Sequence, residues 1–159
     1  MKRFISTILL VAALTTFFTS CNKDENFDGQ TWVSERFDYN FEENDGDFSE
    51  RFQYDFNITL TFTGEQVNAK INLKCVYNQT FLDEFGEWQT YTNIYSDSFT
   101  AKGTYTYDKK NVSISLKDKE FDLDETWRGK VDKDKMTLNV VWDNDDTIDL
   151  DEQVIFTKR

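Results

Sequence analysis

The chain has 159 residues, with 30 Asp and Glu against 18 Lys and Arg, two Cys, no His and no Pro. This length suits one domain. The net charge of −12 repels nucleic acid and anionic lipid headgroups, so we expect neither as a partner. Without His, a nucleophile lacks its commonest activating base.

The first 20 residues have the plan of a bacterial secretory signal. Two cations precede an apolar run from Ile5 to Phe18, which is too short and wrongly flanked for a membrane-spanning helix. Thr19-Ser20 then leads to Cys21. This ending resembles a lipobox, with Phe18 where Leu is usual, and it implies that Cys21 is acylated and becomes the mature N-terminus. The alternative is ordinary cleavage that leaves a free thiol.

The residues after Cys21 point to the cell surface. Lys23, Asp24 and Glu25 resemble the export signal of lipoproteins that some Gram-negative bacteria move to the outer face of the outer membrane. The alternative is a solvated linker. We therefore predict an outer membrane lipoprotein held by its lipid anchor. It would consist of a signal peptide (1–20), an acidic tether (21–30) and one domain (31–159).

The stretch from Phe52 to Tyr77 predicts a β-hairpin. Apolar residues occupy even positions from 52 to 62 and odd positions from 67 to 77, and period-two alternation is typical of a strand with one buried face. A two-residue loop at Gly64-Glu65 suits a type II′ turn. Folding there places Phe62 opposite Val67 and every other apolar residue opposite an apolar partner, which fixes the register.

Similar alternation predicts about nine strands and no helix after the signal. We expect a first strand around Trp32 to Phe41, with Val33, Phe37, Tyr39 and Phe41 on one face. Residues 78–90 are the least regular stretch and the longest predicted connection. The strand pattern returns at Tyr91, where Asn93 interrupts the alternation and suggests a bulge. Successive hairpins indicate an all-β, single antiparallel up-and-down barrel of about eight or nine strands.

This pattern resembles the small lipocalin-like (calycin-type) barrels found behind lipoprotein signals in Gram-negative bacteria. The resemblance covers most of the mature chain, and four runs carry it: Gly103–Asp108, Val112–Leu116, Trp127–Val131 and Lys135–Leu138. The start at Gly29-Gln30-Thr31-Trp32 is one residue longer than the Gly-x-Trp of the family. The resemblance implies a cavity with an opening for a small apolar guest, and no catalytic motif.

Aromatic residues at the inward positions are the candidate ligand site. Barrels of eight strands are either filled by side chains or hold one small ligand. Large side chains favour a filled interior, whereas Ala69, Ala101, Gly103 and Gly129 leave room locally, so both interpretations stay open. The candidate cavity lining consists of Tyr54, Phe56, Tyr77, Tyr105, Tyr107 and Trp127.

Other candidate sites are weaker. Cys75 lies on an apolar face and is expected to fill the core. The acidic residues between Asp143 and Asp151 offer oxygen ligands for calcium, but they lack EF-hand spacing, and a solvated turn is the favoured interpretation. Acidic pairs that resemble glycosidase carboxylates carry little information among 30 acids. We expect no metal site, no cofactor and no enzymatic activity.

The leading hypothesis is a surface-anchored, monomeric binding module for a small apolar or amphipathic ligand. The alternative is a non-enzymatic structural or protein-interaction lipoprotein with a filled core, in which acidic loops form the contact surface.

Overall fold

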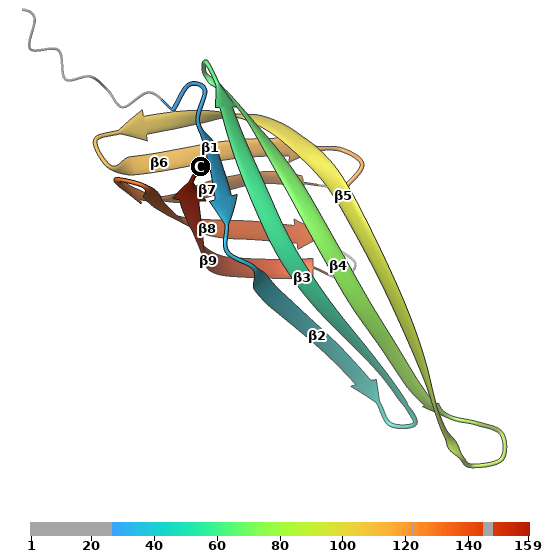
Figure 1. Ribbon diagram of the computed structural model, residues 1–159. Coiled ribbons are helices and arrows are strands. Elements are labelled where there is room, and N and C mark those ends of the chain that lie inside the picture. The colour runs from blue at the N-terminus through green and yellow to red at the C-terminus, as the bar shows by residue number, and fades with distance from the viewer. Residues whose placement is uncertain (1–26, 122, 145–147) are drawn as a thin grey trace, which may run out of the picture.

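The computed structural model describes residues 27–121, 123–144 and 148–159, and nine antiparallel strands make up almost all of them (Figure 1). The all-β prediction is confirmed. The strands are β1 (Thr31–Ser34), β2 (Phe37–Asp45), β3 (Phe48–Thr63), β4 (Gln66–Leu82), β5 (Trp88–Asp108), β6 (Asn111–Asp118), β7 (Leu123–Asp132), β8 (Lys135–Asn144) and β9 (Ile148–Lys158).

Eight of these strands close into a barrel. The hydrogen-bonded order runs from β1 through β9, β8, β7, β6, β5 and β4 to β3, and β1 also pairs with β3. The second strand, β2, is additional: it pairs with the other half of β3, from Phe48 to Phe56. The closed antiparallel up-and-down topology agrees with the prediction and is consistent with a lipocalin-like fold.

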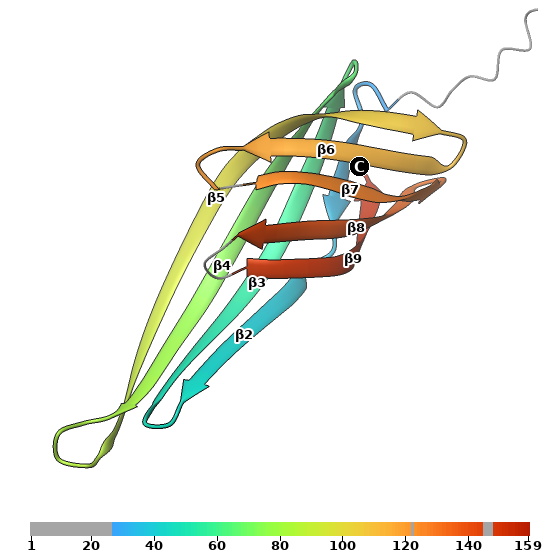
Figure 2. The same cartoon turned by 180° about the vertical axis from the view of Figure 1, so that it is seen from behind.

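Four strands project far beyond the barrel as an arm (Figures 1 and 2). The strands β3, β4 and β5 have 16, 17 and 21 residues, far more than the four to eleven residues of the other strands. At about 3.3 Å per residue, β3 alone spans roughly 50 Å. We define the arm as β2 with residues 48–56 of β3, 73–82 of β4 and 88–99 of β5; residues 83–87 form its tip.

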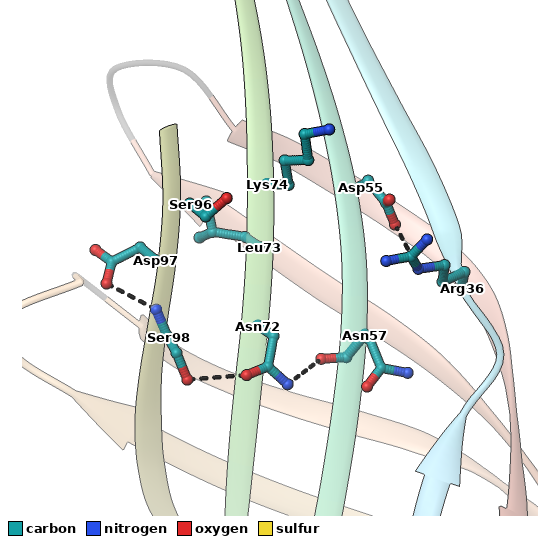
Figure 3. A pocket seen from close by; sticks show the side chains of 9 residues that line it. All are labelled: Arg36, Asp55, Asn57, Asn72, Leu73, Lys74, Ser96, Asp97 and Ser98. Atoms are coloured by element: carbon teal, nitrogen blue, oxygen red, sulfur yellow. Dashed lines mark hydrogen bonds and ion pairs between the residues drawn. The ribbon is translucent and has the colours of Figure 1, made fainter. Parts of the chain in front are cut away.

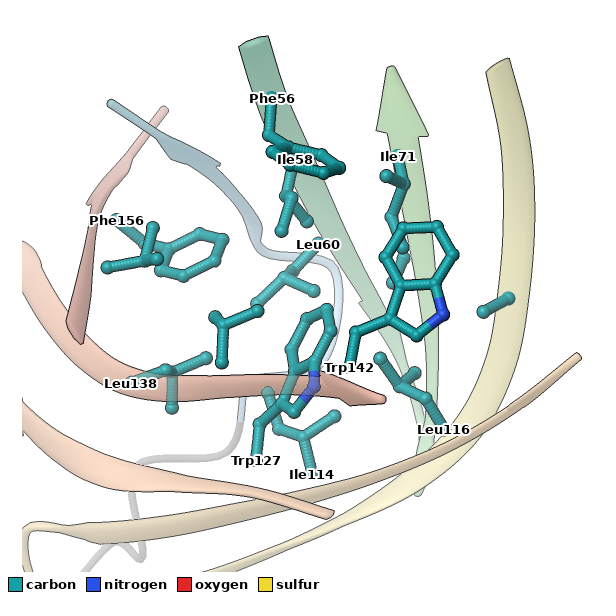
Figure 4. Packing of buried hydrophobic residues seen from close by; sticks show 14 of the residues in the cluster. Phe56, Ile58, Leu60, Ile71, Ile114, Leu116, Trp127, Leu138, Trp142 and Phe156 are labelled. Atoms are coloured by element: carbon teal, nitrogen blue, oxygen red, sulfur yellow. The ribbon is translucent and has the colours of Figure 1, made fainter. Parts of the chain in front are cut away.

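The barrel interior is filled with large side chains (Figure 4). The side chains of Trp32, Phe62, Trp127 and Phe156 are each 1% exposed or less. The indole N–H of Trp127 donates to the carbonyl of Val141 at 2.7 Å, which satisfies its buried polar atom. Dense packing of this kind stabilises the barrel without a guest.

Phe27 closes the end of the barrel where the described chain begins. Its ring contacts those of Trp32, Phe62, Tyr105 and Tyr107 at centroid distances of 4.9–6.0 Å. The N–H of Gly29 donates to the carbonyl of Phe62, at the end of β3 opposite the tip. Sequence analysis assigned Phe27 to the tether, yet its side chain is only 1% exposed.

The central hairpin has the predicted turn and register. Phe62 lies opposite Val67, and Phe52 lies opposite Tyr77, at the far end of the ladder. Gly64 has a φ of +58°, and Glu65 is not among the residues with positive φ, as a type II′ turn requires. The next hairpin also has its predicted register, with Tyr107 opposite Val112.

The first predicted strand is two strands divided by a bulge: Phe37, Tyr39 and Phe41 share one face as predicted, but Val33 does not. Val33 lies opposite Thr59 and Phe37 opposite Phe56, so three residues of one strand face two of the other. The extra residue changes the parity, and Ser34 is buried while Val33 is only half-buried. The N–H of Ile58 donates to the hydroxyl of Ser34 at 2.8 Å, which satisfies the interrupted ladder.

The predicted long connection at residues 78–90 was wrong. Strand β4 continues to Leu82 and β5 begins at Trp88, which leaves a five-residue turn. The β4–β5 register is constant from the Gln66–Thr104 pair to the Leu82–Trp88 pair, so the suggested bulge near Asn93 does not exist. Alternation is weak in this stretch because the outer arm does not surround a core.

Two hairpin turns carry strain that glycine would relieve. Lys109 and Lys133 have φ of 60° and 57°, a conformation that costs an L-residue about 1 kcal/mol. We expect Lys109→Gly to raise the free energy of unfolding by about 0.5 kcal/mol, since glycine also gains entropy in the unfolded chain. Urea denaturation measures this difference. Lys110→Gly, at a neighbouring position without positive φ, should destabilise; equal effects at both positions would contradict the strain argument.

Candidate functional site: the aromatic face of the arm

One face of the arm is a sheet of aromatic rings that continues the barrel interior outward. Tyr39 lies opposite Tyr54, and Phe52 lies between Phe41 and Tyr77 in the next row. Ring centroids are 4.7 Å apart for Phe52 and Tyr77 and 5.9–6.2 Å apart along β3. Strand pleating places these side chains on one side. This aromatic face comprises Phe37, Tyr39, Phe41, Phe48, Phe52, Tyr54, Phe56, Tyr77, Phe81, Tyr91 and Tyr95.

The distal part of the aromatic face is open to solvent. In both views, none of the described strands lies over the outer half of the arm (Figures 1 and 2). Tyr91 is 60% exposed and Tyr95 is 46% exposed, while Phe52 and Tyr77 are half-buried, chiefly by neighbouring rings. A contiguous exposed apolar surface on a folded domain typically marks a site of interaction.

The charges on the aromatic face are all negative. Glu43, Asp45, Glu50 and Asp97 share its parity in the ladder, and no Lys or Arg does so among the described residues of the arm. The hydroxyl of Tyr77 donates to the carboxylate of Glu50. That hydrogen bond, together with burial and the charge of Glu50, raises the pKa of Tyr77 to about 12. Tyr77 therefore remains a neutral donor at physiological pH.

Where the aromatic face meets the barrel, a buried donor has no partner. Trp142 is 3% exposed and packs edge-on against Phe56 and Phe99, with ring centroids 6.1 and 5.5 Å away. Its indole N–H makes no hydrogen bond within the described residues. An unsatisfied buried donor costs about 1–3 kcal/mol. Buried polar groups in folded proteins are normally paired, so this N–H stands out among the described residues.

A second cluster of apolar side chains lies at the tip. Leu82, Phe85 and Trp88 are 36%, 83% and 58% exposed. The carboxylate of Asp83 organises the turn by accepting from the N–H groups of Phe85 and Glu87, both at 2.9 Å. The hydrogen bond from the backbone of Glu87 is the main reason that the pKa of Asp83 is lowered from its ordinary value.

The six predicted lining residues do not surround one cavity. Tyr54, Phe56 and Tyr77 lie together on the aromatic face, whereas Tyr105 and Tyr107 pack against Phe27 at the opposite end of the barrel. Trp127, at 0% exposure, is part of the filled centre. Sequence analysis did not place Phe81, Tyr91 or Tyr95 in the site. Extending the predicted hairpin register to the Phe48–Phe81 pair would have found Phe81, whereas Tyr91 and Tyr95 also require the turn at residues 83–87.

Two hollows formed by described residues lie on the outer face of β3, β4 and β5 and not inside the barrel; Figure 3 shows the larger one. The larger has a volume of about 610 Å³, and the smaller, about 260 Å³, shares Asp55 and Lys74 with it. Arg36 pairs with Asp55 at 3.4 Å, and the hydroxyl of Ser98 donates to Asn72 at 2.9 Å. This polar lining suits water better than an apolar guest.

Several sequence predictions concern residues without a described position. Cys21 and the export signal at Lys23, Asp24 and Glu25 lie outside the described residues, as does part of the acidic turn between Asp143 and Asp151. Among the described residues, no cluster of three or more Cys, Asp and Glu is arranged to hold a metal ion. Nor does the described part of the chain contain a helix that is long and apolar enough to cross a membrane.

The chain was compared with protein-family models, curated proteins and solved structures. No match was found.

Proposed function

We propose that the chain is a surface-anchored, non-enzymatic binding module and that the aromatic face of the arm is its binding surface. The ligand is a small amphipathic molecule with an apolar or aromatic body and a cationic group. The observation that carries this proposal is a sheet face of eleven aromatic residues that opens to solvent at its distal part and whose charged side chains, among the described residues, are all acidic.

The aromatic rings account for the apolar body of the ligand. Aromatic side chains bind partners through large apolar area and through offset or edge-on ring contacts. The ring of Phe52 already contacts the rings of Tyr54 and Tyr77, so a flat ligand meets a surface that needs little reorganisation. Preorganisation of this kind lowers the entropic cost of binding.

The electrostatics of the aromatic face account for the cation. A cation over an aromatic ring gains about 0.5–2 kcal/mol, and the carboxylate of Glu50 lies beside the ring of Tyr77. An anionic ligand meets the opposite situation, because like charges in a partly desolvated site repel. At the base of the face, the indole N–H of Trp142 can donate to a neutral polar group of the ligand.

The lipid anchor is the second part of the proposal, and the end-to-end shape of the molecule supports it. The described chain begins at the end of the barrel that is opposite the tip (Figure 1). An acyl group on Cys21 would therefore hold the arm away from the membrane. Labelling cells with palmitate should mark the wild type and leave Cys21→Ala unmarked; label that persists on this variant would refute the anchor.

The ligand chemistry is tested with three probes that share one body: phenylbutyl-trimethylammonium, phenylbutanol and phenylpentanoate. Titration calorimetry on the purified protein should show the cation binding at least about tenfold more tightly than the anion, a difference of roughly 1.4 kcal/mol. Glu50→Gln should weaken binding of the cationic probe by about three- to tenfold. Asp55→Asn, which neutralises an acid on the outer face of the same strand, is the matched control and should change nothing.

Two results would contradict this proposal. One is equal affinity for the three probes, which would remove the role of charge. The other is an equal loss in Glu50→Gln and Asp55→Asn, which would show that the net charge of the protein attracts the cation and that the aromatic face does not.

A second candidate function is a protein-interaction lipoprotein with a filled core. The observation that favours it is the tip, where Phe85 and Trp88 are 83% and 58% exposed on a turn that the Asp83 carboxylate organises. Exposed aromatic residues on a preorganised loop are typical anchors of protein interfaces.

A further inference from the structure

The arm has two open edges, and only one of them is protected against pairing. Strand β2 pairs with β3 alone, and β5 pairs with β4 alone from Trp88 to Ala101, since β6 joins it only at Lys102. An open edge presents unpaired N–H and C=O groups that invite another strand, and folded proteins usually block it with charge, proline, a bulge or a cover.

The edge formed by β2 is blocked by charge. Four of its nine residues are acidic: Asp38, Glu42, Glu43 and Asp45. A second strand with the same sequence would meet like charges along this edge, and like charges directly opposite one another are destabilising. The negative charge on β2 therefore disfavours pairing with a further strand at this edge.

The edge formed by β5 has none of these protections. Between Trp88 and Ala101 the only charged residue is Asp97, there is no proline, and the constant register with β4 leaves no bulge. Every residue from Trp88 to Ser98 is exposed. The stretch contains three Thr, two Tyr and Ile94, which favour strands. An edge with this composition is expected to be paired in the working protein.

We propose that the β5 edges of two copies of the chain pair antiparallel across a twofold axis at Asn93. A twofold axis perpendicular to the sheet keeps the aromatic faces of both arms on one side, so residues of equal parity must face each other. Centring on Asn93 places Tyr91 of each copy opposite Tyr95 of the other copy, which gives two such pairs. On the other face it places Thr92 opposite Ile94.

Charge and neighbouring registers favour this centre. With the axis at Asn93, Asp97 faces Gln89 of the second copy, and no two like charges meet along the paired stretch. Centring one residue further, at Ile94, would instead set Tyr91 opposite Asp97 and separate the tyrosines. Aromatic cross-strand pairs stabilise a sheet, so the Asn93 register buries the exposed rings of Tyr91 and Tyr95 best. The dimer has one continuous aromatic face of eight strands in place of the monomer expected from the sequence.

Sedimentation velocity across roughly 1–200 μM protein tests the association. We expect a reversible dimer with a dissociation constant on the order of 10 μM, because the new main-chain hydrogen bonds replace bonds to water. Ile94→Lys should weaken the dimer at least about tenfold. Its folding should be unaffected, because Ile94 is 63% exposed, and a thermal melt checks this. Asn40→Lys introduces a lysine on the β2 edge instead and should leave the dimer intact.

Cysteine cross-linking tests the register in a Cys21→Ala background, in which the remaining Cys75 is buried. Opposed residues in an antiparallel pair have Cα atoms about 4.5–5.5 Å apart, within reach of a disulfide, whereas diagonal neighbours lie about 7–8 Å apart. Asn93→Cys should therefore form a disulfide-linked dimer under mild oxidation, and Thr92→Cys and Ile94→Cys should not.

Three results would overturn the proposal. They are a monomer at every concentration, equal effects of Ile94→Lys and Asn40→Lys on the dimer, and a disulfide that forms at residue 92 or 94 in preference to 93. The test does not depend on the proposed ligand, since no probe is present.

Discussion

Trp127→Ala is expected to lower the free energy of unfolding by about 3–5 kcal/mol, the range for removing a large buried aromatic side chain. The ring of Trp127 is 0% exposed in the middle of the barrel. Its loss leaves a cavity between strands that are held by their hydrogen bonds, and it leaves the Val141 carbonyl without the indole donor. For a domain of this size, the melting temperature should fall by roughly 10–20 °C, which differential scanning calorimetry measures.

Trp88→Ala is the matched control, because Trp88 is 58% exposed at the tip. Exposed substitutions of this kind usually change stability by no more than about 0.5 kcal/mol. Similar losses in the two tryptophan variants would show that the barrel centre is not the packed core of the molecule.

Gly129→Ala is expected to cost about 3 kcal/mol or more, although it adds one methyl group. A Cβ at Gly129 would overlap the carbonyl oxygen of Thr137 and crowd the Cα of Leu138, both in the backbone of β8. Backbone in a ladder cannot rotate away as a side chain can, so β7 and β8 would have to separate where Gly129 pairs with Leu138. Urea denaturation of the variant measures the loss.

Gly46→Ala separates this overlap from the general cost of replacing glycine. A Cβ at Gly46 has no atom within 4 Å, and only its φ of +58° is unfavourable. We expect a loss of about 1 kcal/mol there. If Gly129→Ala were no worse than Gly46→Ala, the close approach of β7 and β8 would be refuted.

The sequence predicted best where a strand has one face against the core. From Phe52 to Tyr77 the alternation, the two-residue turn and the pairing of apolar residues all required the same register, and the structure has that register. Each signal there reports burial on one side of the sheet. The barrel topology followed from repeating that argument along the chain.

The outer arm, beyond the Phe52–Tyr77 pair, was missed because its strands lack that one-sided burial. Around Gln79 and Thr92 the pairing is as regular as in the barrel, but main-chain hydrogen bonds leave little trace in the pattern of side chains. The bulge at Ser34 was missed for a different reason. A single extra residue changes the parity, and sequence reasoning had no marker for it, since Ser34 is polar and yet buried.

Three of the six predicted lining residues lie on the aromatic face. Tyr54, Phe56 and Tyr77 belong to the aromatic face because the hairpin register was right. Tyr105 and Tyr107 were assigned to the same cavity because the alternation shows which side chains point inward. It does not show at which end of the barrel they lie. Among the described residues, large inward side chains pack the barrel and the open aromatic rings lie on the arm, while an interior cavity stays a prediction.

The most direct test of the account is a map of backbone amide chemical shifts on adding phenylbutyl-trimethylammonium to the ¹⁵N-labelled protein. The account predicts changes in chemical shift at Phe52, Tyr77 and Tyr95 in the arm and at the indole N–H of Trp142 at its base. All of these changes should saturate at the same ligand concentration. Shifts centred on Phe62 and Trp127 would place the ligand inside the barrel, and shifts centred on Asn57 and Asn72 would place it in the outer hollow. Either result would contradict the assignment of binding to the aromatic face.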